Sequence, residues 1–139
     1  MEEFLRNNDK IQLCSKKSKV LIINTGGTFG FQLANPGHTD DVYLAKNYLM
    51  TELKSGKYPS LNVNFAKEEN FLENDFVKYW IYELEPLLDS ANMDMVHWNL
   101  LCNLVKQAYS CFDGFVLLHG TNTMTYSASA LSFMIKVCK

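Results

Sequence analysis

The feature that most constrains the fold is a buried-strand pattern that ends in a glycine turn. Residues 19–24, Lys-Val-Leu-Ile-Ile-Asn, contain a continuous apolar run rich in β-branched residues, and Thr25-Gly26-Gly27-Thr28 follows at once. A strand with apolar residues on both faces is typical of a parallel sheet that helices cover on both sides. This part of the chain therefore predicts an α/β fold.

The later part of the chain repeats that layout. Residues 77–84 and 115–118 favour strands, residues 86–92 a turn, and residues 119–123 a polar turn. One helix should begin at a cap, Asn92 or Asp94, and end near Ser110, and a second should align Met124, Ala128, Leu131 and Ile135. Alternation of strands and helices predicts a doubly wound parallel sheet.

Three segments are less regular. Residues 29–41 are rich in Gly, Asn and Pro and predict a long loop, which we expect to act as a mobile lid because it follows the first glycine turn. Residues 44–53 favour a helix. Residues 57–74 fit no single pattern, although Leu61, Val63 and Phe65 alternate as in a strand.

Composition excludes several classes of protein. The 139 residues suit one domain, which we place at residues 17–139 after a polar extension at residues 1–16. A net charge of −2 gives no basis for nucleic-acid binding, and no apolar run is long enough to span a membrane. The polar start lacks the pattern of a secretory signal, so we expect a cytoplasmic protein. Four scattered cysteines without a C-x-x-C pair predict free thiols and no metal site.

Both Gly/Thr turns should serve one site. The carboxyl ends of parallel strands form the ligand crevice of an open α/β sheet, so the turns at residues 25–28 and 119–123 would bring hydroxyl and N–H groups to the same rim. Such groups can bind and polarise a carbonyl. The alternative is purely structural: Gly26-Gly27 makes a tight turn, and Thr28 or Thr121 caps the segment that follows it.

A family resemblance rests on these segments. Thr25-Gly-Gly-Thr28 and His119-Gly-Thr-Asn-Thr-Met124 resemble the T-G-G-T-I and H-G-T-D-T-M segments of L-asparaginases. Residues 86–93, Pro-Leu-Leu-Asp-Ser-Ala-Asn-Met, are similar to the P-L-x-D-S-S-D-M segment of the cytoplasmic, type I branch. The resemblance runs from about Lys17 to the end of the chain. It implies the amino-terminal part of an enzyme that hydrolyses L-asparagine to L-aspartate and ammonia.

The resemblance also implies residue roles. Thr28 matches the nucleophile that forms an acyl-enzyme, and Thr121 matches the second threonine, which belongs to a Thr-Lys-Asp relay. Asp89, Ser90 and Ala91 match the segment that grips the substrate's α-carboxylate. Backbone N–H groups of the glycine turns would stabilise the oxyanion. The family uses no metal or organic cofactor, and its full-length members form homo-oligomers.

The chain departs from the family pattern in three places. Asn122 stands where the family has the aspartate that meets the substrate's α-ammonium and pairs with the relay lysine, so the site keeps the shape of that residue and loses its charge. His38 or Tyr43 would take the place of a tyrosine that assists the nucleophile. The relay lysine and the small second domain would lie beyond Lys139, so we expect an incomplete domain that is inactive alone.

Two other functions stay open. The chain could be the asparaginase-like subunit of a tRNA-dependent amidotransferase, which shares both threonine motifs. It could also be a non-catalytic binding module that keeps the fold, an interpretation that Asn122 favours. We expect His119 to hold the strand-to-turn junction through a ring hydrogen bond, and Tyr79, Trp80 and Tyr82 to pack within their strand.

Overall fold

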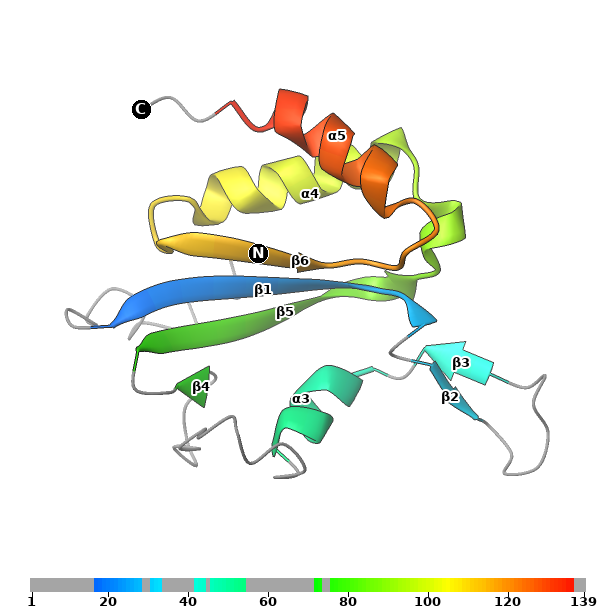
Figure 1. Cartoon of the computed structure of the whole chain (residues 1–139), viewed down its shortest axis with the longest axis horizontal. Coiled ribbons are helices and arrows are strands. Elements are labelled where there is room, and N and C mark those ends of the chain that lie inside the picture. The colour runs from blue at the N-terminus through cyan, green and yellow to red at the C-terminus, as the bar shows by residue number, and fades with distance from the viewer. Residues whose placement is uncertain are drawn as a thin grey trace.

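The computed structural model describes residues 17–28, 31–33, 42–44, 46–54, 72–73 and 76–136. Figure 1 shows three long strands side by side: β1 (Ser18–Gly26), β5 (Val77–Leu88) and β6 (Gly114–Leu118). The sheet order is β4-β5-β1-β6, in which β5 and β6 both run parallel to β1. The short strand β4 (Leu72–Glu73) pairs antiparallel with β5. The predicted α/β class is therefore confirmed.

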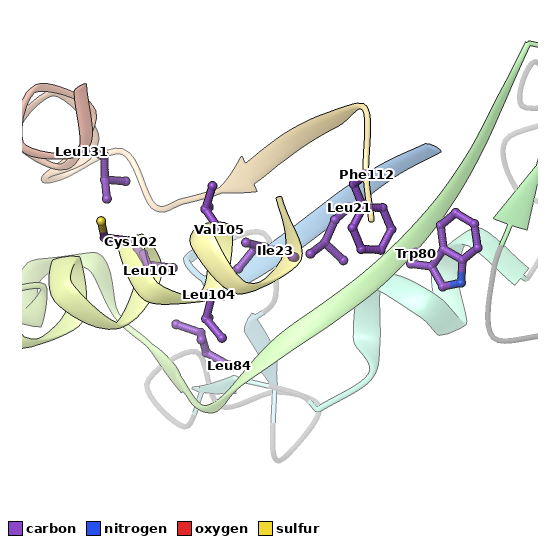
Figure 2. Close-up of a cluster of buried hydrophobic side chains, with 11 residues drawn as sticks. Leu21, Ile23, Trp80, Leu84, Leu101, Cys102, Leu104, Val105, Phe112 and Leu131 are labelled. Atoms are coloured by element: carbon purple, nitrogen blue, oxygen red, sulfur yellow. The ribbon is translucent and has the colours of Figure 1, made fainter. Parts of the chain in front are cut away.

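The core lies between these strands and helix α4 (Met95–Ala108). Side chains alternate across a strand, so Leu21 and Ile23, both fully buried, share one face of β1. They belong to one cluster with side chains of α4 and β5, which Figure 2 shows. Trp80 packs edge to face on Phe112, with ring centroids 5.4 Å apart. The other buried members of the cluster are Leu84, Leu101, Cys102, Leu104, Val105, Ala108 and Leu131.

Helix α3 (Tyr48–Lys54) lies on the other side of the sheet. Asn47, directly before this helix, and Met50 within it line a pocket of about 200 Å³ together with Ile81 and Glu83 of β5. Ile81 and Glu83 alternate with Trp80 and so point to the face opposite the main core. Within the described part of the chain, α4 lies on one face of the sheet and α3 on the other, as the doubly wound prediction requires.

The start of α4 follows from its sequence. Asp94 is the N-cap residue, and its carboxylate accepts hydrogen bonds from the backbone N–H groups of Val96 and His97 at 2.9 and 3.2 Å. The bond from the His97 N–H is the main reason that the pKa of Asp94 lies below its usual value. Of the two predicted caps, Asp94 is correct and Asn92 is not, because Asn92 closes the preceding 3₁₀ turn η2 (Ser90–Asn92).

Three predicted boundaries are wrong. Part of the predicted loop at residues 29–41 is strand β2 (Phe31–Leu33), which pairs antiparallel with β3 (Val42–Leu44). The helix expected from Leu44 begins at Tyr48, because residues 42–44 are needed for that pairing. Strand β5 continues past residue 84 to Leu88, into the expected turn. The lid prediction and the alternation at residues 61–65 lie mainly outside the described residues.

The last helix, α5 (Met124–Met134), differs from its predicted face. Leu131 is buried as expected, but Met124 is 49% exposed. The other buried position is Ser127, whose hydroxyl accepts a 2.9 Å hydrogen bond from the Trp98 indole N–H of α4. The buried face of α5 therefore includes a polar contact with α4, which apolar periodicity alone could not predict.

Two further predictions concern the cysteine thiols and membrane-spanning segments. Cys102 and Cys111 are free thiols, as expected, whereas Cys14 and Cys138 lie outside the described residues. Within the described ranges, no helix combines the length and apolar character needed to cross a bilayer.

The neighbouring leucines of α4 provide a test of this core. We expect Leu101→Ala, which empties a fully buried position, to lower the free energy of unfolding by about 2–5 kcal/mol. Leu100→Ala, at a position that is 45% exposed, is the matched control and should cost less than about 1 kcal/mol. Urea denaturation of both variants measures the difference, and equal losses would contradict the packing of α4 against the sheet.

Candidate active site

The candidate residues lie where the parallel strands end. β1 ends at Gly26, β5 at Leu88 and β6 at Leu118, and because the strands are parallel these ends share one edge of the sheet. The segment after each strand carries candidate residues. In open α/β sheets this edge is the usual ligand crevice.

The turn after β1 needs two glycines. Gly26 and Gly27 have φ angles of +114° and +105°, a region that other residues rarely adopt. A Cβ on Gly26 would also lie only 2.7 Å from the backbone nitrogen of Leu88. The Gly27 N–H donates a 3.1 Å hydrogen bond to the Leu88 carbonyl. The turn is therefore packed directly on the end of β5.

The turns after β1 and β6 are in backbone contact. A Cβ on Gly27 would lie 2.8 Å from the Cα of Gly120, closer than real Cβ atoms come to other atoms. A Cβ on Gly120 would lie 2.7 Å from the Cβ of Ser90, the first residue of η2. The three candidate segments thus meet around Gly27, Gly120 and Ser90, at distances that only glycine permits.

Side-chain hydrogen bonds also join these segments. The buried Thr25 hydroxyl donates to the Leu118 carbonyl at 2.9 Å, which ties β1 to the end of β6. Thr123 occupies the N-cap position of α5, and its hydroxyl donates to the Ser90 carbonyl at 2.7 Å. Because Thr123 holds that position, the alternative in which Thr121 caps the helix is wrong.

The candidate side chains differ in exposure. Thr28 follows Gly27 directly, Thr121 and Asn122 follow Gly120, and all three residues are exposed. Asp89 and Ala91 are exposed as well, and the Asp89 carboxylate accepts the Ala91 N–H at 3.0 Å.

Ser90, in contrast, is 3% exposed and lies against Gly120. The structure therefore brings together the backbones of all three segments, with five exposed residues and one buried serine.

Two backbone N–H groups of the first glycine turn already have partners. The Gly26 N–H donates to the Asn24 side-chain oxygen at 3.1 Å, and the Gly27 N–H donates to the Leu88 carbonyl. The expectation that N–H groups of the glycine turns stabilise an oxyanion therefore stays a prediction for the other amides of the two turns.

The two remaining sequence hypotheses have different outcomes. His119 behaves as expected, because its ring Nδ1 lies 2.7 Å from the Gly120 carbonyl, and since a carbonyl only accepts, Nδ1 carries the proton. Tyr43 lies in β3 and is 52% exposed, whereas His38 is outside the described residues. The role of assisting a nucleophile stays a prediction for both residues.

The sequence did not indicate which side chains hold the strand ends together. Asn24, Thr25 and Thr123 all bond across the strand ends, and Asn24 and Thr25 do so from the end of an apolar run. Burial of a polar residue inside an apolar run was the available signal, because such a group needs a partner.

Comparison with known proteins agrees with the fold and the motifs. Residues 19–139 match the model of the family described as asparaginase, N-terminal. The chain is 33% identical to L-asparaginase 1 of Escherichia coli K12 over 121 residues, which are 87% of this chain and 31% of that protein. The structure of L-asparaginase I from Vibrio cholerae superposes with a TM-score of 0.59 at 32% identity, covering 84% of this chain and 30% of that one.

A shorter match links the chain to a different protein. Over 48 residues, 34% of this chain and 11% of the other, it is 52% identical to a glutamyl-tRNA(Gln) amidotransferase subunit of Methanosarcina acetivorans. The matches to whole asparaginases cover far more of the chain. The chain belongs to the asparaginase family, as the sequence motifs indicated, and spans about a third of the length of these two bacterial L-asparaginases.

The glycine contact can be tested directly. Gly27→Ala combines a positive φ with overlap on Gly120, so we expect it to lower the free energy of unfolding by at least about 2 kcal/mol. Gly114→Ala is the matched control, because its Cβ would meet only the Val20 side chain at 3.8 Å. Urea denaturation should find that control within about 1 kcal/mol of the parent. A Gly27→Ala chain as stable as the parent would mean that the turns do not touch.

Proposed function

We propose that this chain forms the nucleophile-bearing part of an amide hydrolase that converts L-asparagine to L-aspartate and ammonia. The observation that carries the proposal is the backbone contact of Gly27 with Gly120. It supports a common site because Thr28 and Thr121 are the next residues along each turn. Residues 89–91 adjoin the same contact through Ser90.

In the proposed reaction Thr28 is the nucleophile. Its hydroxyl oxygen attacks the carbonyl carbon of the substrate's side-chain amide, the C–N bond breaks, and ammonia leaves with the proton that the hydroxyl gives up. Water then attacks the resulting ester, which releases aspartate and restores the hydroxyl. Thr121 is assigned the transfer of protons between these groups, because an unassisted threonine hydroxyl is a weak nucleophile.

Residues 89–91 are assigned to the α-carboxylate of the substrate. The Asp89 carboxylate already accepts the Ala91 N–H, so we give it the role of shaping the turn. The Ser90 hydroxyl, held against Gly120, is the side-chain donor that we assign to the substrate. A donor fixed by packing loses little freedom when it binds, which favours affinity.

The proposal extends to the surroundings of the site. We propose L-asparagine as the small-molecule partner, a cytoplasmic location, and a homo-oligomer for the complete enzyme. These follow from similarity to the type I L-asparaginases and not from the geometry of this chain.

A specific residue favours a second candidate function, a non-catalytic binding module. Asn122 is neutral where the resemblance places an aspartate, so the site has lost a counter-charge for an α-ammonium group. Such a chain could keep the crevice without turnover. Two substitutions separate the candidates.

The first concerns the nucleophile. Residues 19–139 can replace the matched segment of E. coli L-asparaginase 1, so that the chimera contains the rest of an asparaginase. Thr28→Ala should then reduce ammonia release from L-asparagine at least about 10³-fold, a conservative figure beside the roughly 10⁶ measured for nucleophile loss in a serine protease. Thr28→Ser, which keeps a hydroxyl, should stay within about tenfold of the parent.

Thr125→Ala, at an exposed threonine of α5, is the matched control and should change nothing. If Thr28→Ala hydrolyses L-asparagine as fast as the control, Thr28 is not the nucleophile.

The second concerns Asn122 in the same chimera. Asn122→Asp restores the charge that the resemblance implies, and we expect ammonia release to rise at least about 10²-fold, a fraction of the roughly 10⁴ that an Asp→Asn change costs in a serine protease. Adding Thr28→Ala should abolish the gain, because the chemistry still passes through that hydroxyl. A folded Asn122→Asp variant that is no faster than its parent would favour the binding module.

A further inference from the structure

A chain of hydrogen bonds runs from the start of α3 to the glycine turn. The Asn47 backbone N–H donates to one carboxylate oxygen of Glu83 at 2.7 Å. The other oxygen of Glu83 accepts from the Asn24 side-chain amide at 3.0 Å. The Asn24 side-chain oxygen then accepts the Gly26 N–H at 3.1 Å. Three segments far apart in the sequence are thereby joined through two side chains.

The chemistry of the partners fixes the direction of every bond. A backbone N–H only donates and a carboxylate only accepts, so the Asn24 amide must turn its oxygen to Gly26 and its nitrogen to Glu83. Glu83 faces two donors and therefore needs two acceptor oxygens, which glutamine could not supply. Asn24 is 3% exposed, so loss of either bond would leave a buried polar group without its partner.

The position of Asn24 explains why a side chain is needed here. Asn24 is opposite Glu83 in the β1–β5 pairing, but Gly26 is opposite Leu88, so the register shifts between these two pairs. The pairing is interrupted just before the turn that leads to Thr28. The Asn24 oxygen bonds the backbone N–H two residues on, which is the Asx-turn pattern, and so provides the bond that orders the turn at this interruption.

We propose that Asn24 and Glu83 are positioning residues that fix the glycine turn before Thr28 and connect it to the first turn of α3. The link to hydrolysis rests on the proposed role of Thr28, whereas the fixing of the turn does not. In this arrangement the Glu83 carboxylate holds both ends of the segment between β1 and α3. A displacement of α3 would therefore loosen the turn that presents Thr28.

The neighbouring Glu85 provides a contrast. It forms an ion pair with Lys46 at 2.5 Å, but both side chains are mostly exposed, at 76% and 65%. Exposed pairs of this kind contribute little to stability because water and salt screen them. Glu83 and Glu85 thus lie on the same strand and near the same pocket, and only Glu83 belongs to the chain of bonds that reaches the turn.

The test exchanges donor and acceptor between the two residues. Asn24→Asp removes a donor and sets two carboxylates against each other, and Glu83→Gln removes an acceptor. In the double variant the new amide nitrogen at position 83 can donate to the new carboxylate at position 24. The amide oxygen at position 83 then accepts from Asn47, and the second carboxylate oxygen at position 24 accepts from Gly26. Every bond is restored with the polarity between the two side chains reversed, and the net charge is that of the parent.

Amide hydrogen exchange of Gly26, measured by NMR on the whole 139-residue chain, is the readout. We expect each single variant to speed exchange of this amide at least tenfold, and the double variant to slow it again by at least tenfold relative to Asn24→Asp. Glu85→Gln is the control and should leave the exchange rate within twofold of the parent. If a single variant does not fold, recovery of a folded chain in the double variant is the same rescue.

Several results would overturn the proposal. These are unchanged Gly26 exchange in both single variants, a double variant no better than the worse single one, or a Glu85→Gln effect as large as that of Glu83→Gln. The proposed function fails separately. If Gly26 exchange responds as expected but Thr28→Ala leaves hydrolysis by the chimera intact, the positioning holds and the nucleophile assignment falls.

Discussion

The candidate site depends on the approach of two backbones at Gly27 and Gly120. A Cβ on Gly27 would lie 2.8 Å from the Gly120 Cα, so neither turn could carry another residue at this contact without moving the other. Because each glycine directly precedes a threonine, the same contact that joins the turns also sets where Thr28 and Thr121 begin. The Gly120 contact with Ser90 adds the third segment. The requirement for glycine at these positions and the convergence of the three segments are therefore consequences of the same contact.

The sheet creates the conditions for that contact. β1 is flanked by β5 and β6 running in the same direction, so all three strands deliver their ends to one edge. The shift of register after Asn24 then lets β5 continue to Leu88, whose carbonyl receives the Gly27 N–H. This bond and the one from the Gly26 N–H to the Asn24 side chain hold the turn, so these two amides already have partners.

The sequence correctly predicted the elements that a local pattern of residues determines. The apolar run at residues 19–24 predicted a buried strand, and Asp94 is a predicted cap of α4, because both signals lie within a few consecutive residues. The prediction failed where an element depends on a hydrogen bond or a strand pairing with another part of the chain. The buried face of α5 includes the bond from Trp98 to Ser127, and β2 exists only through pairing with β3. The convergence of the Gly/Thr turns was predictable from topology. Asn24 at the end of an apolar run signals a need for a polar partner, but that the partner is Glu83, 59 residues further along the chain, could not be predicted.

Most of the atoms that hold the turns together at the edge of the sheet are not the atoms proposed to act on a substrate. Contacts of Gly27, Gly120, Thr25 and Thr123 hold the turns together, and none of these contacts involves the side chain of Asn122. Asn122 is exposed, so exchanging amide for carboxylate there costs the fold little. The same scaffold can therefore carry a hydrolase or a binding protein. Family membership accounts for the scaffold, and our proposal assigns the difference between the two functions to the charge at this one exposed position.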